Sequence, residues 1–204
     1  MARQERIAII GLGTVGTAIG VGLKRAKLSN IEVAGHDRDA DTSGHAKKRG
    51  AVDSTHWNLP ATVEGAGLVI LAMPYDEIIP TVQAIAPVLA PGAVVSDTAI
   101  VKRELLEQVP GHLPEGVHYI GGNPILRWQE TSPGVREATT QEATYCLLPA
   151  LSAPHQAVET MTGLVSAIGA RPLFVDPAEH DAFMAATVQV PELFSAALLS
   201  TLSS

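Results

Sequence analysis

Segment 7–16 reads Ile7-Ala8-Ile9-Ile10-Gly11-Leu12-Gly13-Thr14-Val15-Gly16, an apolar run that leads directly into the spacing G-x-G-x-x-G. A short β-branched run such as residues 7–10 is typical of a strand buried on both faces of a sheet. Apolar residues then recur at nearly helical period through residues 14–27, which predicts a helix. A strand, a glycine turn and a helix in this order predict the first unit of a dinucleotide-binding fold.

Each of the three glycines has its own physical reason to be in this turn. Gly11 permits the tight turn, Gly13 lets the backbone approach a pyrophosphate, and Gly16 lets the helix pack closely on the strand. Free N–H groups at the start of the helix would face the diphosphate. We therefore expect the diphosphate to bind at Gly11, Leu12, Gly13, Thr14, Val15 and Gly16. The alternative, a glycine-rich turn that binds nothing, is disfavoured by the neighbouring strand, helix and acidic residue.

That acidic residue is Asp37, which follows a second predicted strand at residues 31–35. It lies about 20 residues beyond the third glycine, where a carboxylate receives the hydroxyls of the adenine ribose. Its charge would repel a ribose 2′-phosphate, which favours NAD as the cofactor. Arg38 keeps NADP open, because an arginine beside the acid can stack on adenine or accommodate a phosphate.

The middle of the chain continues the alternation of strands and helices. We expect further strands at residues 50–52, 68–72, 93–96 and 117–120, and helices at residues 40–49, 78–89 and 102–108. This order predicts an α/β fold with a doubly wound, mostly parallel, Rossmann-type sheet. Ligands of such sheets collect at the carboxyl ends of strands, so Ala72, Met73 and Pro74 should border the nicotinamide half of the cofactor.

Residues 125–142 interrupt this rhythm with a polar, charged segment, for which we expect a long loop that acts as a lid or binding segment. A strand at 143–148, a helix at 154–169 and a strand at 171–175 should follow. The last helix has a clear start, with Asp176 as its cap, Pro177 in its first turn and Glu179 placed for a capping box.

The last helix carries an apolar stripe that nothing after residue 204 can cover. The stripe consists of Phe183, Ala186, Val190, Leu193, Phe194, Ala197 and Leu198. Either a second subunit buries it or the chain is a piece of a longer protein. We therefore divide the chain into a dinucleotide-binding domain at residues 1–176 and the start of a helical domain at residues 177–204.

The composition of the chain limits the kinds of partner and compartment that we expect for it. The 204 residues are 46% hydrophobic and carry a net charge of −7, which disfavours nucleic acid as a partner. The single cysteine, Cys146, fits a reducing cytoplasm and is expected to be a buried strand thiol. Residues 182–204 are rich in Ser and Thr and contain Pro191, which makes them a poor membrane span. The seven histidines show no metal-ligand spacing.

The sequence resembles the prephenate/arogenate dehydrogenases of tyrosine biosynthesis over nearly its whole length. The shared segments are residues 9–13, residues 68–74, the segment from Asp97 to Lys102, Gly121-Gly122-x-Pro124, and Asp176-Pro177-x-Glu179-His180-Asp181. The resemblance implies hydride transfer from the ring hydroxyl carbon of prephenate or arogenate to a nicotinamide, with decarboxylation and aromatisation. It also implies a small carboxylic acid as substrate, and a helical dimerisation domain through which the chain forms a homodimer.

Departures from the family pattern fall on the substrate side. Asn123 replaces a histidine before proline, Ile100 replaces a serine, and Gln189 and Glu192 replace the histidines around the proline of the last helix. A run of small residues is replaced by Ile125-Leu126-Arg127-Trp128. Loss of a general base costs roughly 10²–10⁴ in rate, because asparagine can hold a hydroxyl but cannot accept its proton.

Three residues are candidates for the catalytic side of the site. We expect Asn123 to orient the substrate hydroxyl, Lys102 to support the site electrostatically, and Arg127 to bind the substrate carboxylate, a role that Arg136 could share. His180 either lines the cleft or belongs to a capping turn. Two other functions stay open: a related dehydrogenase or imine reductase that acts on another small acid, and a nucleotide-binding domain without turnover.

Overall fold

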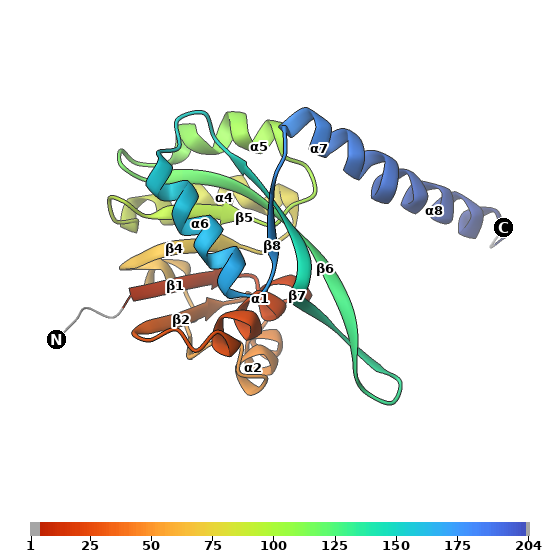
Figure 1. Cartoon of the computed structure of the whole chain (residues 1–204), viewed down its shortest axis with the longest axis horizontal. Helices are drawn as coiled ribbons and strands as arrows, with labels where there is room; N and C mark the ends of the chain where they lie inside the picture. The colour runs from red at the N-terminus through yellow and green to blue at the C-terminus, as the bar shows by residue number, and fades with distance from the viewer. Residues whose placement is uncertain (1–4, 203–204) are drawn as a thin grey trace.

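The computed structural model describes residues 5–202, and its central feature is one eight-stranded sheet (Figure 1). The strands lie in the order β3-β2-β1-β4-β5-β6-β7-β8. The strands at its centre are β1 (Glu5–Ile10), β4 (Ala66–Leu71) and β5 (Val94–Asp97), which pair in parallel and are almost entirely buried. The continuous apolar runs of these strands therefore pack helices on both faces, as expected for a doubly wound fold.

The helices cover the two faces of the sheet with separate apolar cores. One core packs α1 (Thr14–Arg25), α2 (Ala40–Lys48) and α6 (His155–Ala167) on the sheet. The other packs α3 (Leu59–Val63), α4 (Tyr75–Ile85) and α5 (Arg103–Gln108). Short 3₁₀ turns at Ala86–Val88 and Val109–His112 follow α4 and α5. Successive side chains of each buried strand alternate between the two cores.

The edge next to β2 (Ile31–His36) differs from the expected one. The strand expected at residues 50–52 is wrong, because the backbone pairs with β2 only at β3 (Ser54–Thr55). Ala51 and Val52 are buried nonetheless, packed in the core beside α1 and α2. Their apolar character therefore reflects burial below the helices rather than a place in the sheet.

The segment 125–142 is a two-stranded arm, and the expected loop is wrong. Strands β6 (His118–Ser132) and β7 (Val135–Pro149) pair in antiparallel fashion, and Figure 1 shows their tip reaching beyond the body. Pro133 and Gly134 make the turn, with Gly134 at φ +77°. Most side chains near the tip are exposed, so the strand has no apolar alternation there. Proline and glycine between two polar runs were the signal for a hairpin.

After the arm the chain runs as expected through α6 and then β8 (Arg171–Phe174), which pairs in parallel with β7. Cys146 lies in β7 at 4% exposure, so the prediction of a buried strand thiol is confirmed. Burial raises the pKa of this thiol.

The last helix begins as predicted and then projects from the body (Figure 1). The Asp176 carboxylate accepts from the N–H groups of Ala178 and Glu179, which caps α7 (Pro177–Met184). A π-helical turn at Ala185–Gln189 joins α7 to α8 (Val190–Leu202). The turn ends two residues before Pro191, which has no N–H to donate to the helix. The helical segment Pro177–Leu202 is long and apolar enough to cross a membrane, by length and composition only. One such helix is weak evidence of a membrane span.

The glycine turn gives the first prediction. A Cβ on Gly16 would lie 1.9 Å from the carbonyl oxygen of Gly11, so Gly16→Ala should lower the free energy of unfolding by about 3 kcal/mol. Gly44, within α2, has open space around its Cβ position among the described residues. Gly44→Ala should therefore raise the free energy of unfolding by about 0.5–1 kcal/mol. Urea unfolding measures both, and equal effects would contradict the packing argument.

Candidate cofactor and active site

The glycine loop has the form of an anion cradle. Gly11 adopts φ +89°, and a Cβ there would lie 2.1 Å from the carbonyl oxygen of Ala72. A Cβ on Gly13, in contrast, would meet no atom of residues 5–202 within 4 Å. No side chain of the described chain caps the start of α1, so the first N–H groups of this helix are available to an anion. The loop therefore fits a dinucleotide diphosphate.

Asp37 is held beside this loop by the backbone. Its Oδ2 accepts from the N–H of Leu12 at 2.7 Å, and its Oδ1 accepts from the N–H of Asp39 at 2.9 Å. Each oxygen of a carboxylate has a second lone pair. Asp37 can therefore still accept from the hydroxyls of a ribose, while the amide of Leu12 is already used.

A cavity of about 310 Å³ joins the predicted cofactor residues. Its lining includes Gly11, Gly13, Asp37, Arg38, Ala72, Met73 and Pro74. The cavity lies at the carboxyl ends of β1, β2 and β4, where a cofactor is expected. Thr14 and Val15 follow at the exposed start of α1. Arg38 pairs with Glu77, which also lines this cavity.

A second cavity, of about 350 Å³, lies on the other side of Gly13 and Thr14. Side chains of α2 and of the arm line it, including Arg49 and Trp128. The arm is tied to α2 by an ion pair between Arg49 and Glu137 at 2.5 Å. The arm therefore walls one side of the glycine loop.

The carboxylate of Asp97, at the end of β5, is the centre of a buried polar network. It is fully buried and forms an ion pair with Lys102, which is also fully buried. It accepts further hydrogen bonds from the Tyr119 hydroxyl at 2.8 Å and from the N–H groups of Ala99 and Gly122. Burial lowers the pKa of Lys102, against the attraction of Asp97, and burial beside Asp97 raises the pKa of Tyr119.

A second chain of hydrogen bonds runs from Asn123 to Asp181. Asn123 Nδ2 lies 3.0 Å from His180 Nε2, and His180 Nδ1 lies 2.9 Å from Asp181 Oδ1. The Asp181 carboxylate also accepts from the N–H groups of Lys102 and Arg103, at the start of α5. Asn123 and His180 are 3% and 2% exposed. This chain of contacts joins β6, α7 and α5 at one place.

The proton positions in this chain follow from the charge on Asp181. A carboxylate can only accept, so a neutral His180 carries its proton on Nδ1 and accepts at Nε2 from the Asn123 amide. Asn123 Oδ1 is then left as an acceptor for another hydroxyl. Asn123 and Lys102 are linked through His180 and Asp181, whose carboxylate accepts from the N–H of Lys102, and their roles in the site stay predictions. The sequence left the role of His180 open.

Arg127 and Arg136 lie on the exposed part of the arm. Arg127 pairs with Glu142 at 3.3 Å, and its side chain is 58% exposed. Arg136 lines the arm-side cavity, opposite Glu130 in the register of the two strands. Neither forms part of the Asp97 or Asn123 network, so a role with a substrate carboxylate stays a prediction.

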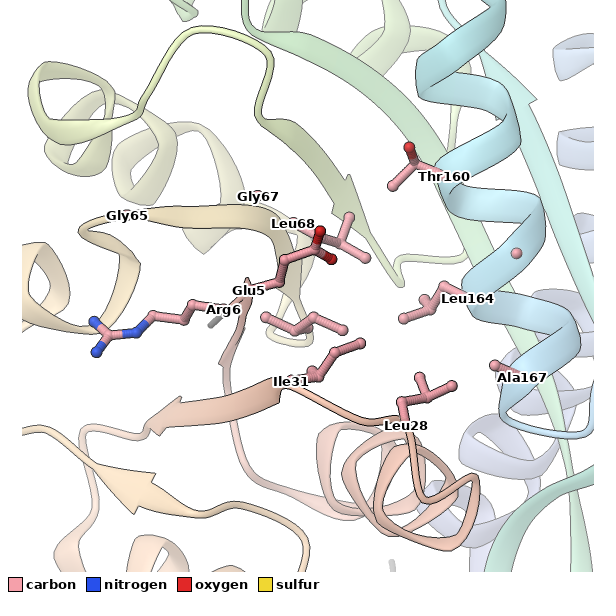
Figure 2. A pocket seen from close by; sticks show the side chains of 12 residues that line it. Glu5, Arg6, Leu28, Ile31, Gly65, Gly67, Leu68, Thr160, Leu164 and Ala167 are labelled. Atoms are coloured by element: carbon pink, nitrogen blue, oxygen red, sulfur yellow. The ribbon is translucent and has the colours of Figure 1, made fainter. Parts of the chain in front are cut away.

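A larger apolar cavity, of about 590 Å³, lies away from all of these residues, at the opposite end of the strands. Figure 2 shows Leu28, Ile31 and Leu164 lining it, with the Arg6 side chain pointing away. The Arg6 guanidinium instead binds Glu32 and the carbonyl oxygens of Ala61 and Glu64. This cavity therefore lies apart from the predicted cofactor and catalytic residues. Among residues 5–202, no group of three or more His, Cys, Asp or Glu is placed to hold a metal.

Comparisons with known proteins bear on the family and the fold. The family model described as "Prephenate dehydrogenase, nucleotide-binding domain" matches residues 19–173. A prephenate dehydrogenase of Lactococcus lactis is 27% identical over 96% of this chain, which spans only 53% of that protein. The arogenate dehydrogenase structure from Synechocystis is 25% identical and superposes with a TM-score of 0.78, over 96% of this chain and 68% of that one.

A third comparison shows the same fold at lower identity. The Aquifex aeolicus prephenate dehydrogenase, solved with hydroxyphenyl propionate and NAD⁺, is 18% identical and superposes with a TM-score of 0.82. The superposition covers 97% of this chain and 69% of that one. The Rossmann-type fold predicted from the sequence is confirmed.

The Asp97 network gives the second prediction. Asp97→Leu leaves the buried Lys102 ammonium unpaired, because the described residues offer it no other carboxylate contact. The substitution should lower the free energy of unfolding by about 3–5 kcal/mol. Lys102→Met should cost less, because the Asp97 carboxylate keeps its three other donors. Chemical denaturation of both variants at the same pH measures the difference. A larger loss for Lys102→Met would contradict this assignment.

Proposed function

The chain belongs to the prephenate dehydrogenase family, through its nucleotide-binding domain, and from that premise we propose that it is an NAD-dependent oxidoreductase acting on prephenate or arogenate. The reaction is hydride transfer with decarboxylation and aromatisation, a step of tyrosine biosynthesis. The observation that carries the proposal is the placement of the anion cradle, Asp37 and the Asn123 network at the carboxyl ends of the strands of a family member.

NAD is the cofactor that fits the donor set of this chain. The uncapped start of α1 would bind its diphosphate, and Asp37 would accept from its ribose hydroxyls. Bound NAD⁺ supplies the hydride acceptor. Ala72, Met73 and Pro74 line the same cavity and would bound the path of the cofactor toward β5 and β6. NADP is the less favoured cofactor because Asp37 repels a 2′-phosphate.

On the substrate side, Asn123 would hold the reacting hydroxyl through Oδ1. His180 keeps the amide of Asn123 in this orientation by accepting from Nδ2. Lys102 would act indirectly, because its ammonium is buried against Asp97, whose carboxylate also accepts from the N–H of Gly122, next to Asn123 in β6. Arg127 is the candidate for binding the substrate carboxylate, which would compete with Glu142 for the Arg127 guanidinium.

The C-terminal helix would begin a helical dimerisation domain at residue 177. Its exposed apolar side chains include Phe183, Leu193, Phe194, Leu198 and Leu202. Burial of this stripe against a second copy would give a homodimer. The chain spans about half the length of the Lactococcus relative. We place the protein in the cytoplasm, in line with its single cysteine.

A second candidate function is a nucleotide-binding domain without turnover. Asn123, Gln189 and Glu192 stand where the family pattern has histidines, and Glu192 is exposed on α8. A related dehydrogenase or imine reductase acting on another small acid would tolerate the same replacements. All three functions require the dinucleotide, so cofactor binding does not distinguish them. Turnover of prephenate or arogenate distinguishes the proposed reaction from the other two.

The proposed function predicts NADH formation by the purified chain with prephenate or arogenate, at a rate roughly 10²–10⁴ below that of a family member with the histidine. Absorbance at the nicotinamide band measures the rate, and light scattering in the same buffer gives the oligomeric state. NAD⁺ binding without turnover on either acid would contradict the proposed reaction and leave the non-catalytic domain and a dehydrogenase of another small acid. A turning-over dimer would support both the reaction and the interface.

The role of Asp37 can be tested separately from turnover. Asp37→Ala removes the acceptor for the ribose hydroxyls and the charge that repels a 2′-phosphate, so NAD⁺ affinity should fall at least tenfold more than NADP⁺ affinity, about 1.4 kcal/mol of difference. Calorimetric titration of both dinucleotides measures the ratio. Equal losses for the two dinucleotides would refute the assignment.

A further inference from the structure

Two residues that line the predicted cofactor cavity form a partly exposed ion pair. Arg38, just after β2, and Glu77, in the first turn of α4, are joined at 2.6 Å between Nη1 and Oε1. The Arg38 side chain is 78% exposed and that of Glu77 is 37% exposed. Both residues line the cavity that contains Asp37. The pair therefore sits beside the ribose position that Asp37 defines.

We propose that Glu77 is a specificity-determining residue, which selects NAD over NADP by holding the Arg38 guanidinium away from the 2′-position of the adenine ribose. This inference rests on the proposed function, since it needs a dinucleotide in the cavity. An arginine next to the ribose acid is the group that can accept a 2′-phosphate. Glu77 occupies the guanidinium with a carboxylate of this chain.

The charges around the cavity support this selection. Asp37 and Glu77 carry two negative charges and Arg38 carries one positive charge, so these three side chains leave a net charge of −1. His36 also lines the cavity, and its Nδ1 is engaged by the carbonyl oxygen of His56 at 2.9 Å. A ribose diol can donate to Asp37, whereas a 2′-phosphate would meet the net negative charge.

The position of Asp37 explains why the choice depends on Glu77. Asp37 is fixed by the N–H groups of Leu12 and Asp39 and cannot turn away from the ribose. Within residues 5–202 the Arg38 side chain has no such hydrogen bond to the backbone, and it is restrained by Glu77. Removal of the Glu77 charge frees a planar donor that can bind a phosphate in bidentate fashion.

The test is the variant Glu77→Gln, which keeps the size of the side chain and removes its charge. Its ratio of NADP⁺ to NAD⁺ affinity should rise about three- to fivefold over that of the original chain, in keeping with the modest strength of an exposed pair. Calorimetric titration with each dinucleotide at low salt gives both dissociation constants, with no need for turnover. The increase should shrink at high salt.

Asp76→Asn is the matched control. Asp76 neighbours Glu77 in the first turn of α4 and is exposed, but it does not line the cavity. The variant loses the same charge and should leave the affinity ratio within about twofold of the original. An equal rise in Asp76→Asn and Glu77→Gln would overturn the proposal, since it would show a general effect of net charge.

A second background tests whether Glu77 acts through Arg38. In Arg38→Ala, the further change Glu77→Gln should leave the affinity ratio nearly unaltered, because no guanidinium remains to be released. A rise as large as in the presence of Arg38 would overturn the inference while leaving the proposed function intact. If the original chain binds neither dinucleotide, the proposed function and this inference both fail.

Discussion

A buried carboxylate needs hydrogen bonds to replace the water it has lost, and Asp97 obtains them from Lys102, Tyr119, Ala99 and Gly122. These donors come from the segment after β5 and from β6, so the need to satisfy one charge fixes the relative position of two strand ends. Asn123 follows Gly122 directly and is therefore placed by the same charge. Asp181 has a similar role, because its carboxylate accepts from the N–H groups at the start of α5 and orients His180.

The cofactor half of the site could be predicted from the sequence because it depends on local backbone geometry. A tight turn, a close approach and a helix start each require a particular residue at a fixed spacing, as Gly11, Gly13 and Gly16 show. The buried parallel strands were equally predictable from their continuous apolar runs. The arm at 125–142 was missed because its strands are exposed, which removes the alternation that marks a strand.

The substrate half depends on contacts between distant segments, and this is why sequence patterns described it only in part. Asn123 and His180 are 57 residues apart in the chain but lie in contact. The sequence showed both residues and showed Asp181 beside His180, but no periodicity indicates that an amide and an imidazole meet. The same holds for Asp97, whose four donors could be identified only once β5 and β6 were side by side.

The two ion pairs of the site differ in which property of the protein their removal would change. Asp97 and Lys102 are wholly buried, so loss of one partner leaves an unpaired charge without water and acts on the whole fold. The Arg38 side chain is largely exposed and that of Glu77 is partly exposed, and such a pair adds only about 0–1 kcal/mol to stability. Its charges can therefore be altered without unfolding the protein. The buried pair fixes the geometry of the site, whereas the exposed pair can adjust which dinucleotide the site accepts.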